Sequence, residues 1–184
     1  MAGSLIKVDE FTVSSAVANV ILGGGSSGSS GLNASIDSSY DVYMIRINNV
    51  TGTTEPNAIN IRFTVGGTAD TSANYDWAHK VLRTGAVFQN QSNTNQTAIN
   101  GLDSTGTSTS ETVNAIYYFF NFNNASEYSF MTYEASARSS GAELNARQGG
   151  GVLTVAQATD GVQFFMSNNN IEVGSQFVLY GLKK

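Results

Sequence analysis

Residues 113–137 constrain the fold more than any other part of the chain, because aromatic residues occupy both faces of one predicted strand. Successive side chains of a strand point to opposite faces, so Tyr117 and Phe119 share one face. A strand with one face in water alternates apolar and polar residues, and this strand does not. We therefore expect Tyr117 and Phe119 to fill the core of a sandwich, and the opposite set to meet a second sheet or another subunit. That opposite set is Tyr118, Phe120 and Phe122. A short polar loop leads to a second strand, so the whole segment predicts a hairpin.

Short apolar runs separated by turn residues continue along the rest of the chain. Residues 59–65 alternate most clearly, with Ile59, Ile61 and Phe63 on one side of a predicted strand. The runs recur at fairly regular spacing and do not alternate with helical patterns. The sequence therefore predicts an all-β chain of about eight to ten strands. The predicted architecture is an antiparallel β-sandwich, jelly-roll-like, with an N-terminal strand or arm.

Residues 74–83 fit two kinds of secondary structure. A helix would place Tyr75 and Leu82 on one face, with an asparagine cap before them. A strand would place Tyr75, Trp77 and His79 on one face. The aromatic content and the all-β surroundings favour the strand.

Several segments rich in glycine and asparagine are predicted as connections between strands. The triplet Gly149–Gly151 predicts a turn before the next strand. The dipeptides Asn100–Gly101 and Asp160–Gly161 predict two further turns. Residues 84–110 are mostly Asn, Gln, Ser, Thr and Gly, so we expect them to be mainly loop.

The length of 184 residues favours a single sandwich domain over residues 1–184. Residues 1–22 are expected to form N-terminal strands or an arm, with a bulge where the parity of the apolar residues shifts. Residues 23–39 contain GGGSSGSSG and predict a flexible loop. Residues 40–184 are expected to form the main sandwich.

The low charge of the chain bears on its partners. Charged residues make up 12%, about half the typical share. This composition favours an assembled protein, and a polar but uncharged monomer surface is the alternative interpretation. The net charge is −5 and the basic residues are scattered, so no nucleic acid partner is expected. No export signal is visible and no apolar run is long enough for a membrane span, so we expect a protein made in a cytoplasm, with no membrane partner.

The residue types that catalysis needs are sparse. His79 is the only histidine, and no G-x-S-x-G segment accompanies it. Glu134 lies in the aromatic hairpin, but no second carboxylate is distinguished as its partner. No catalytic, cofactor-binding or metal-binding residue is therefore predicted, and without cysteine no disulfide or thiolate site exists. Calcium remains an alternative at two acidic pairs, Asp37 with Asp41 and Asp70 with Asp76.

One aromatic group offers an alternative binding role. On a strand, Tyr75, Trp77 and His79 would form a platform on which a host-surface glycan stacks. In the other interpretation the same three side chains fill the interior of the sandwich. The exposure of these side chains separates the two interpretations.

Three segments carry a resemblance to a known class of proteins. They are SSYDVYMIRINNV, NFNNASEYSF and GGGVLTVAQATDGVQFFMSNNNIEVGSQFVLYGLKK. Their order is a YDVY-like strand, an asparagine-rich centre, a GGG turn, a D-G-hydrophobic strand and a terminal LYG strand. This order resembles small virion structural proteins of marine bacteriophages, cyanophages in particular. The likeness covers about Tyr40 to Lys184 and also the start LIKVDEFTVSSAV.

The resemblance implies a non-enzymatic subunit that decorates or builds the capsid, tail or fibre of a virion assembled in the host cytoplasm. Its partners would be other virion proteins and further copies of the same chain, in a trimer or other ring. A host-surface glycan is the alternative partner. We expect the N-terminal strand to pair with a neighbouring subunit. The expected subunit contacts are Ile6, Val8, Phe11, Tyr118, Phe120 and Phe122.

Overall fold

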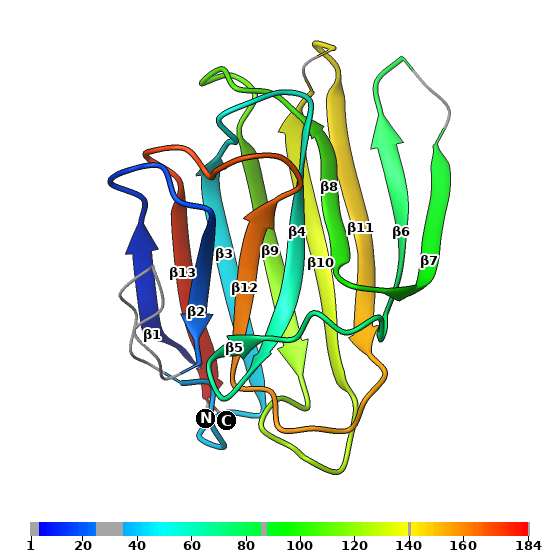
Figure 1. Cartoon of the computed structure of the whole chain (residues 1–184). Helices are drawn as coiled ribbons and strands as arrows, with labels where there is room; N and C mark the ends of the chain where they lie inside the picture. Colours follow the sequence, from blue (N-terminus) through cyan, green and yellow to red (C-terminus); the bar gives the residue numbers. More distant parts are fainter. Residues whose placement is uncertain (1–3, 25–34, 86–87, 140, 184) are drawn as a thin grey trace.

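The computed structural model describes residues 4–24, 35–85, 88–139 and 141–183. These residues form two antiparallel sheets that pack face to face, and none of them is helical (Figure 1). The predicted all-β sandwich is therefore confirmed. The jelly-roll description stays a prediction.

The larger sheet contains eight strands, and every neighbouring pair is antiparallel. Aromatic and β-branched residues are frequent in its central strands, which is the composition that favours a pleated, half-buried surface. In spatial order the strands are β1 (Ser4–Thr12), β13 (Gln176–Lys183), β3 (Val42–Val50), β9 (Val113–Phe120), β10 (Ser129–Arg138), β11 (Leu144–Leu153), β6 (Tyr75–Arg83) and β7 (Gln89–Gln96).

The smaller sheet contains five strands and covers part of the larger one. Strand β4 lies at its centre and pairs with β12 on one side and with β5 and β8 on the other. The strands are β2 (Asn19–Gly23), β12 (Gly161–Met166), β4 (Asn57–Val65), β5 (Thr68–Ala69) and β8 (Ile99–Thr105).

The core lies between the sheets and is centred on aromatic rings. Tyr117 and Phe119 of β9 are fully buried, as predicted. The ring centroid of Phe119 lies 6.1 Å from that of Phe63 in β4, and the centroid of Tyr117 lies 5.3 Å from that of Phe164 in β12. The first arm of the hairpin therefore joins the two sheets through edge-on and tilted ring contacts, which stabilise aromatic pairs beyond simple burial.

Several local predictions are confirmed. Strands β9 and β10 form the predicted hairpin. Residues 74–83 form strand β6 rather than a helix. The N-terminal strand has the predicted bulge, because its register against β13 shifts between Lys7 and Asp9.

The predicted turn at Gly149–Gly151 is wrong, because these glycines lie in the middle of β11. At these positions glycine lets atoms of β6 and β8 approach the backbone of β11 closely, and it does not reverse the chain. A Cβ on Gly149 would overlap the His79 Cβ and the Ala78 carbonyl oxygen of β6, and one on Gly151 would lie 2.6 Å from Ile99 Cδ1 of β8. Glycine thus lets a neighbouring strand and a covering side chain press against this strand.

The polar segment 84–110 was expected to be mainly loop, but it contains β7 and β8. Asn100–Gly101 lies inside β8, so the turn predicted there is also wrong. Asp160 enters β12 without a turn and instead links two segments: its carboxylate accepts hydrogen bonds from Thr64 Oγ1 at 2.6 Å and from the Gly67 backbone N–H at 3.0 Å. Pairing with distant strands and the hydrogen bonds of Asp160 determine the backbone at these two dipeptides, so the turns that they indicated do not form.

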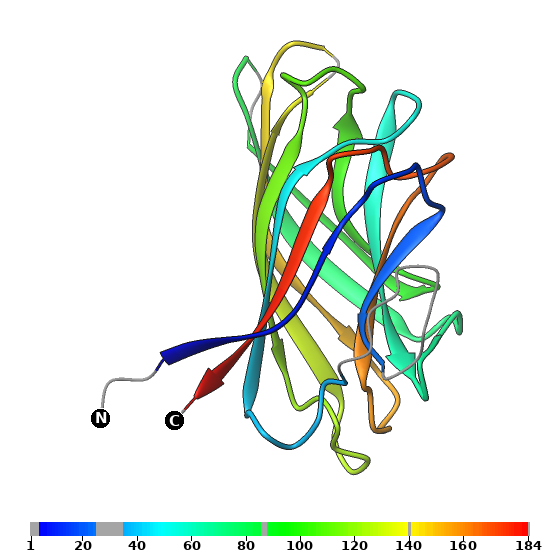
Figure 2. The ribbon, with the colours of Figure 1, turned by 90° about the vertical axis from the view of Figure 1, so that its left-hand side faces the viewer.

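The N-terminal segment contributes one strand to each sheet. Strand β1 pairs with β13 of its own chain at the edge of the larger sheet, and the two run beyond the body of the sandwich (Figure 2). The pairing of β1 with a neighbouring subunit stays a prediction. Strand β2 pairs with β12 in the smaller sheet. Residues 25–34 of the predicted glycine-serine loop lie outside the described residues.

The close approach at β11 yields a stability prediction. We expect Gly149→Ala to lower the free energy of unfolding by about 1–3 kcal/mol, because the new methyl group overpacks the contact with His79. Gly141→Ala is the matched control, since its nearest neighbour would be Ser139 Oγ at 3.6 Å, and we expect a change within about 0.5 kcal/mol. Urea unfolding measures both. Equal stabilities of the two variants would contradict this account of the glycines.

Candidate functional site

The outer face of the larger sheet carries apolar residues that remain in contact with water. Ile116 and Tyr118 of β9 and Phe130 of β10 are 40%, 37% and 42% exposed. These residues lie in the middle of the sheet, where a solvated face is normally polar. The outer face is therefore a candidate interaction surface.

Strand register arranges the outer side chains in rows that cross the sheet. Two adjacent rows are largely apolar, and we call their apolar members the apolar patch. The patch consists of Val42, Met44, Tyr118, Phe120, Phe130, Val152 and Tyr180. The row beside it, which we call the charged row, consists of Glu10, Val178, Arg46, Ile116, Glu134, Gln148 and Lys80. In it, Gln148 Nε2 donates to Glu134 Oε1 at 2.9 Å. Two adjoining hollows, of about 570 and 340 Å³, lie along this row.

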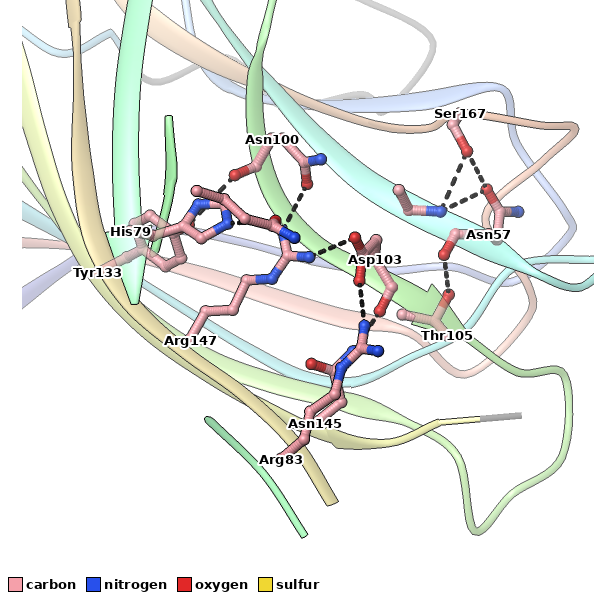
Figure 3. Close-up of polar contacts among 12 residues, drawn as sticks. Asn57, His79, Arg83, Asn100, Asp103, Thr105, Tyr133, Asn145, Arg147 and Ser167 are labelled. Atoms are coloured by element: carbon pink, nitrogen blue, oxygen red, sulfur yellow. Dashed lines mark hydrogen bonds and ion pairs between the residues drawn. The ribbon is translucent and has the colours of Figure 1, made fainter. Parts of the chain in front are cut away.

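The interior between β6, β8, β10 and β11 holds a polar network, shown in Figure 3. Arg147 of β11 is fully buried and forms an ion pair with Asp103 of β8. Arg83 lies 3.2 Å from the same carboxylate, and Asn145 Nδ2 donates to the Asp103 carbonyl oxygen at 2.6 Å. Burial opposes the charged form of Asp103, but Arg147 and then Arg83 outweigh it, so the pKa of Asp103 lies below its ordinary value.

The network continues to the only histidine. The Tyr133 hydroxyl lies 2.9 Å from His79 Nδ1 and donates to the Asn100 carbonyl oxygen at 3.1 Å. His79 Nε2 lies 3.1 Å from Gln91 Oε1, and Arg147 donates to Asn100 Oδ1 at 3.0 Å. Burial, followed by the charge of Arg147, lowers the pKa of His79, so its ring is neutral near pH 7.

This network holds strands together. Each of its side chains contacts another member of the network, and Asp103 and Arg83 reach solvent, each with 31% of its side chain exposed. Its contacts fasten β8 across β10, β11 and β6. Sequence reasoning missed Arg147, Asp103 and Asn145. If residues 149–151 are assigned to a strand, the alternation of side chains places Asn145 and Arg147 on its inner face. This alternation is the sequence signal that would have identified these two residues.

The aromatic platform predicted for a glycan lies inside the sandwich. Tyr75 and His79 are buried, and Trp77 is half-buried and stacked on His79, with ring centroids 4.9 Å apart. The three side chains therefore fill the interior, because β6 turns this face toward β8 and β4, and they offer no exposed platform.

The predicted subunit contacts separate into two groups. Tyr118 and Phe120 lie on the outer face, as expected from their parity. Phe122 does not join them: it follows the end of β9, and its ring packs against Phe63 and Phe119 at the core, with centroids 4.8 and 5.3 Å away. The strand ends before Phe122, so the alternation that predicted its direction no longer applies.

The three subunit contacts predicted in the N-terminal strand also differ in their exposure. Ile6 is exposed and pairs with Gly181 of β13, whereas Val8 and Phe11 are half-buried and pack against the core. Only Ile6 of these three is thus available to a partner without rearrangement of β1.

In the described part of the chain, no three His, Asp or Glu residues come close enough to hold a metal ion. Among the described residues, no helix is long and apolar enough to cross a membrane. No family model, curated protein or solved structure matches the chain.

The buried ion pair yields a second stability prediction. We expect Asp103→Ala to lower the free energy of unfolding by about 3 kcal/mol, because Arg147 would keep its charge inside the protein without a partner. Adding Arg147→Met should recover most of the loss. Lys7→Met, which removes an exposed ion pair with Glu10, is the control and should change stability by less than about 0.5 kcal/mol. A double variant as unstable as Asp103→Ala would contradict this role.

His79 yields a pH prediction. Its pKa in the folded protein lies below the ordinary value of 6.5, so below about pH 6.5 the unfolded chain binds more protons than the folded one. The free energy of unfolding should therefore fall as the pH drops from about 7.5 toward the lowered folded pKa. Because the chain has one histidine, His79→Gln should flatten this dependence. Thermal unfolding across this range measures it, and an unchanged slope in the variant would contradict the assignment.

Proposed function

We propose that this protein is a non-enzymatic structural subunit of a bacteriophage virion, which acts by binding other proteins through the outer face of its larger sheet. The observation that carries the proposal is the exposure of Ile116, Tyr118 and Phe130 in the middle of that sheet. Contiguous exposed apolar patches on soluble proteins mark interaction sites. A protein partner that covers this patch would remove its apolar surface from water.

The sequence resemblance supports the virion as the setting of these contacts. The YDVY segment leads into β3, and the LYG segment is part of β13; these two strands pair with each other, and β3 pairs with β9. The segments that carry the resemblance thus contribute directly to the outer face. Capsid decoration, tail and fibre are the three places that the proposal includes, and a jelly-roll topology, common among viral shell proteins, belongs to the same proposal.

A host-surface glycan is the alternative partner. Tyr75 and His79 of the predicted platform are buried and Trp77 is half-buried, so a glycan would need another surface. The hollows beside Glu134 are where its hydroxyl groups would find carboxylate and amide partners. This alternative is tested together with the main proposal.

The proposal is tested by the incorporation of this chain into phage particles. We expect imaging of purified phage particles to show this chain in repeated copies, with the outer face covered. Tyr118→Lys should reduce incorporation of the chain about tenfold or more, because it places a charge in the apolar patch. Val173→Lys is the control, since Val173 is an exposed apolar residue away from the patch. Absence from particles, or binding to a glycan array without incorporation, would contradict the proposal.

A further inference from the structure

We propose that the outer face binds the same face of a second copy of this chain, about a two-fold axis that lies in the interface and runs along β9 past Ile116. This inference rests on the proposed function, because it names the partner of the same surface. It differs from the trimer or ring expected from the sequence, since a two-fold contact closes after two copies.

The distribution of charge in the charged row carries the inference. Arg46 lies one strand to one side of Ile116, and Glu134 lies one strand to the other side. Glu10 and Lys80 lie three strands away on the same two sides. All four charged side chains are exposed. At equal distances from β9 the charges are therefore opposite in sign.

Two-fold symmetry turns this pattern into complementary contacts. An axis along β9 exchanges the two sides of the sheet, so Arg46 of each copy faces Glu134 of the other, and Glu10 faces Lys80. An axis along the charged row would instead place every residue over its own copy, with Arg46 against Arg46 and Glu134 against Glu134. Like charges placed opposite one another are unfavourable, so the row selects the axis along β9.

The charges nearest the axis matter most. Glu10 already pairs with Lys7 in its own chain, at 3.0 Å, and Lys80 Nζ donates to Asn90 at 3.1 Å. Glu134 accepts a hydrogen bond from Gln148 on its Oε1 atom, and its side chain is exposed. The pair Arg46 with Glu134 is therefore the sharpest place to test the arrangement.

The same axis matches large side chains to small ones in the neighbouring row. Tyr180 and Gly150 lie two strands to either side of Tyr118, so each Tyr180 faces a glycine of the other copy. Met44 faces Thr132, and Tyr118 meets Tyr118 on the axis. A tyrosine over a glycine lets two sheets approach, which is the size complementarity that close packing requires.

The face is large enough for a stable contact. Seven strands spaced about 4.8 Å apart and the three rows spaced about 6.6 Å apart cover roughly 670 Å². That lies within the range of about 600–1,000 Å² that one partner contributes to an interface of standard size. Twisted sheets that pack face to face in an aligned manner cross at about 30°, so the axis runs close to the direction of β9 rather than strictly along it.

Charge reversal tests the pairing. Sedimentation equilibrium of the full chain should show a dimer, and Arg46→Glu or Glu134→Arg should each weaken dimerisation at least tenfold, since symmetry creates two like-charge contacts. The double variant should return to within about threefold of the original chain. Arg138→Glu, an exposed reversal on β10 outside the row, is the control and should leave dimerisation within about threefold. Thermal unfolding of each variant verifies that the fold is kept.

Crosslinking tests the axis. The chain has no cysteine, so Ile116→Cys introduces a single thiol on the axis. Facing sheets lie about 10 Å apart, too far for a direct disulfide, so a short bis-maleimide is the probe. We expect Ile116→Cys to give a covalent dimer. Leu144→Cys should give none, because it lies on the same face two strands from β9, so the two thiols would lie about 20 Å apart across the axis.

The outcomes separate this inference from the proposed function. Three results together support the inference: each single charge reversal weakens dimerisation, the double variant restores it, and Ile116→Cys gives a covalent dimer. A folded monomer at all concentrations overturns it, and so does a trimer or ring that the reversals leave unchanged. Incorporation into particles is decided by the separate particle assay, so the proposed function stands or falls independently.

Discussion

The unequal width of the two sheets is the constraint on which the rest of the structure depends. Eight strands face five, so the smaller sheet covers the inner face near β3, β9 and β10, where Tyr117 and Phe164 pack together. Farther along, β8, which pairs with β4 in the smaller sheet, covers β11 and β6 (Figure 1). There the interior becomes polar, and Arg147 is stable because Asp103 of β8 reaches it. The ion pair of Arg147 and Asp103 thus fills the interior at β8, where the smaller sheet ends.

Sequence reasoning succeeded where alternation and burial agree. The alternation in 59–65 and the double aromatic pattern of the hairpin predicted strands that the structure contains, with Tyr117 and Phe119 in the core. It failed at β7, which has no apolar residue and depends on pairing with β6. It failed also at β8, where the buried Ile99 and Leu102 do not alternate, because the register against β4 shifts between them. The glycines of β11 were mistaken for a turn for a related reason. Their role depends on His79 and Ile99, which no local pattern reveals.

The sequence predicted the apolar residues of the candidate surface but not the arrangement of its charges. Parity placed Tyr118 and Phe120 together on a face that needed a cover, and the structure leaves that face exposed. The relation between Arg46 and Glu134 was not visible, because it exists only after β3 pairs in register with the distant hairpin of β9 and β10. Long-range register converts scattered charges into an ordered row, and the surface gains specificity from that order as well as from its apolar area.

The pairing of β1 with β13 has a mechanical consequence. The register joins Ser4 to Lys183, so the two ends of the described chain leave the sandwich side by side. A force that pulls these ends apart would load the hydrogen bonds of the ribbon one pair at a time, as in the opening of a zipper. The aromatic core and the ion pair of Arg147 would carry no load until β1 had peeled away. Attachment through both ends would therefore yield under small forces, whereas attachment through the broad face of the sheet would distribute tension over many contacts at once.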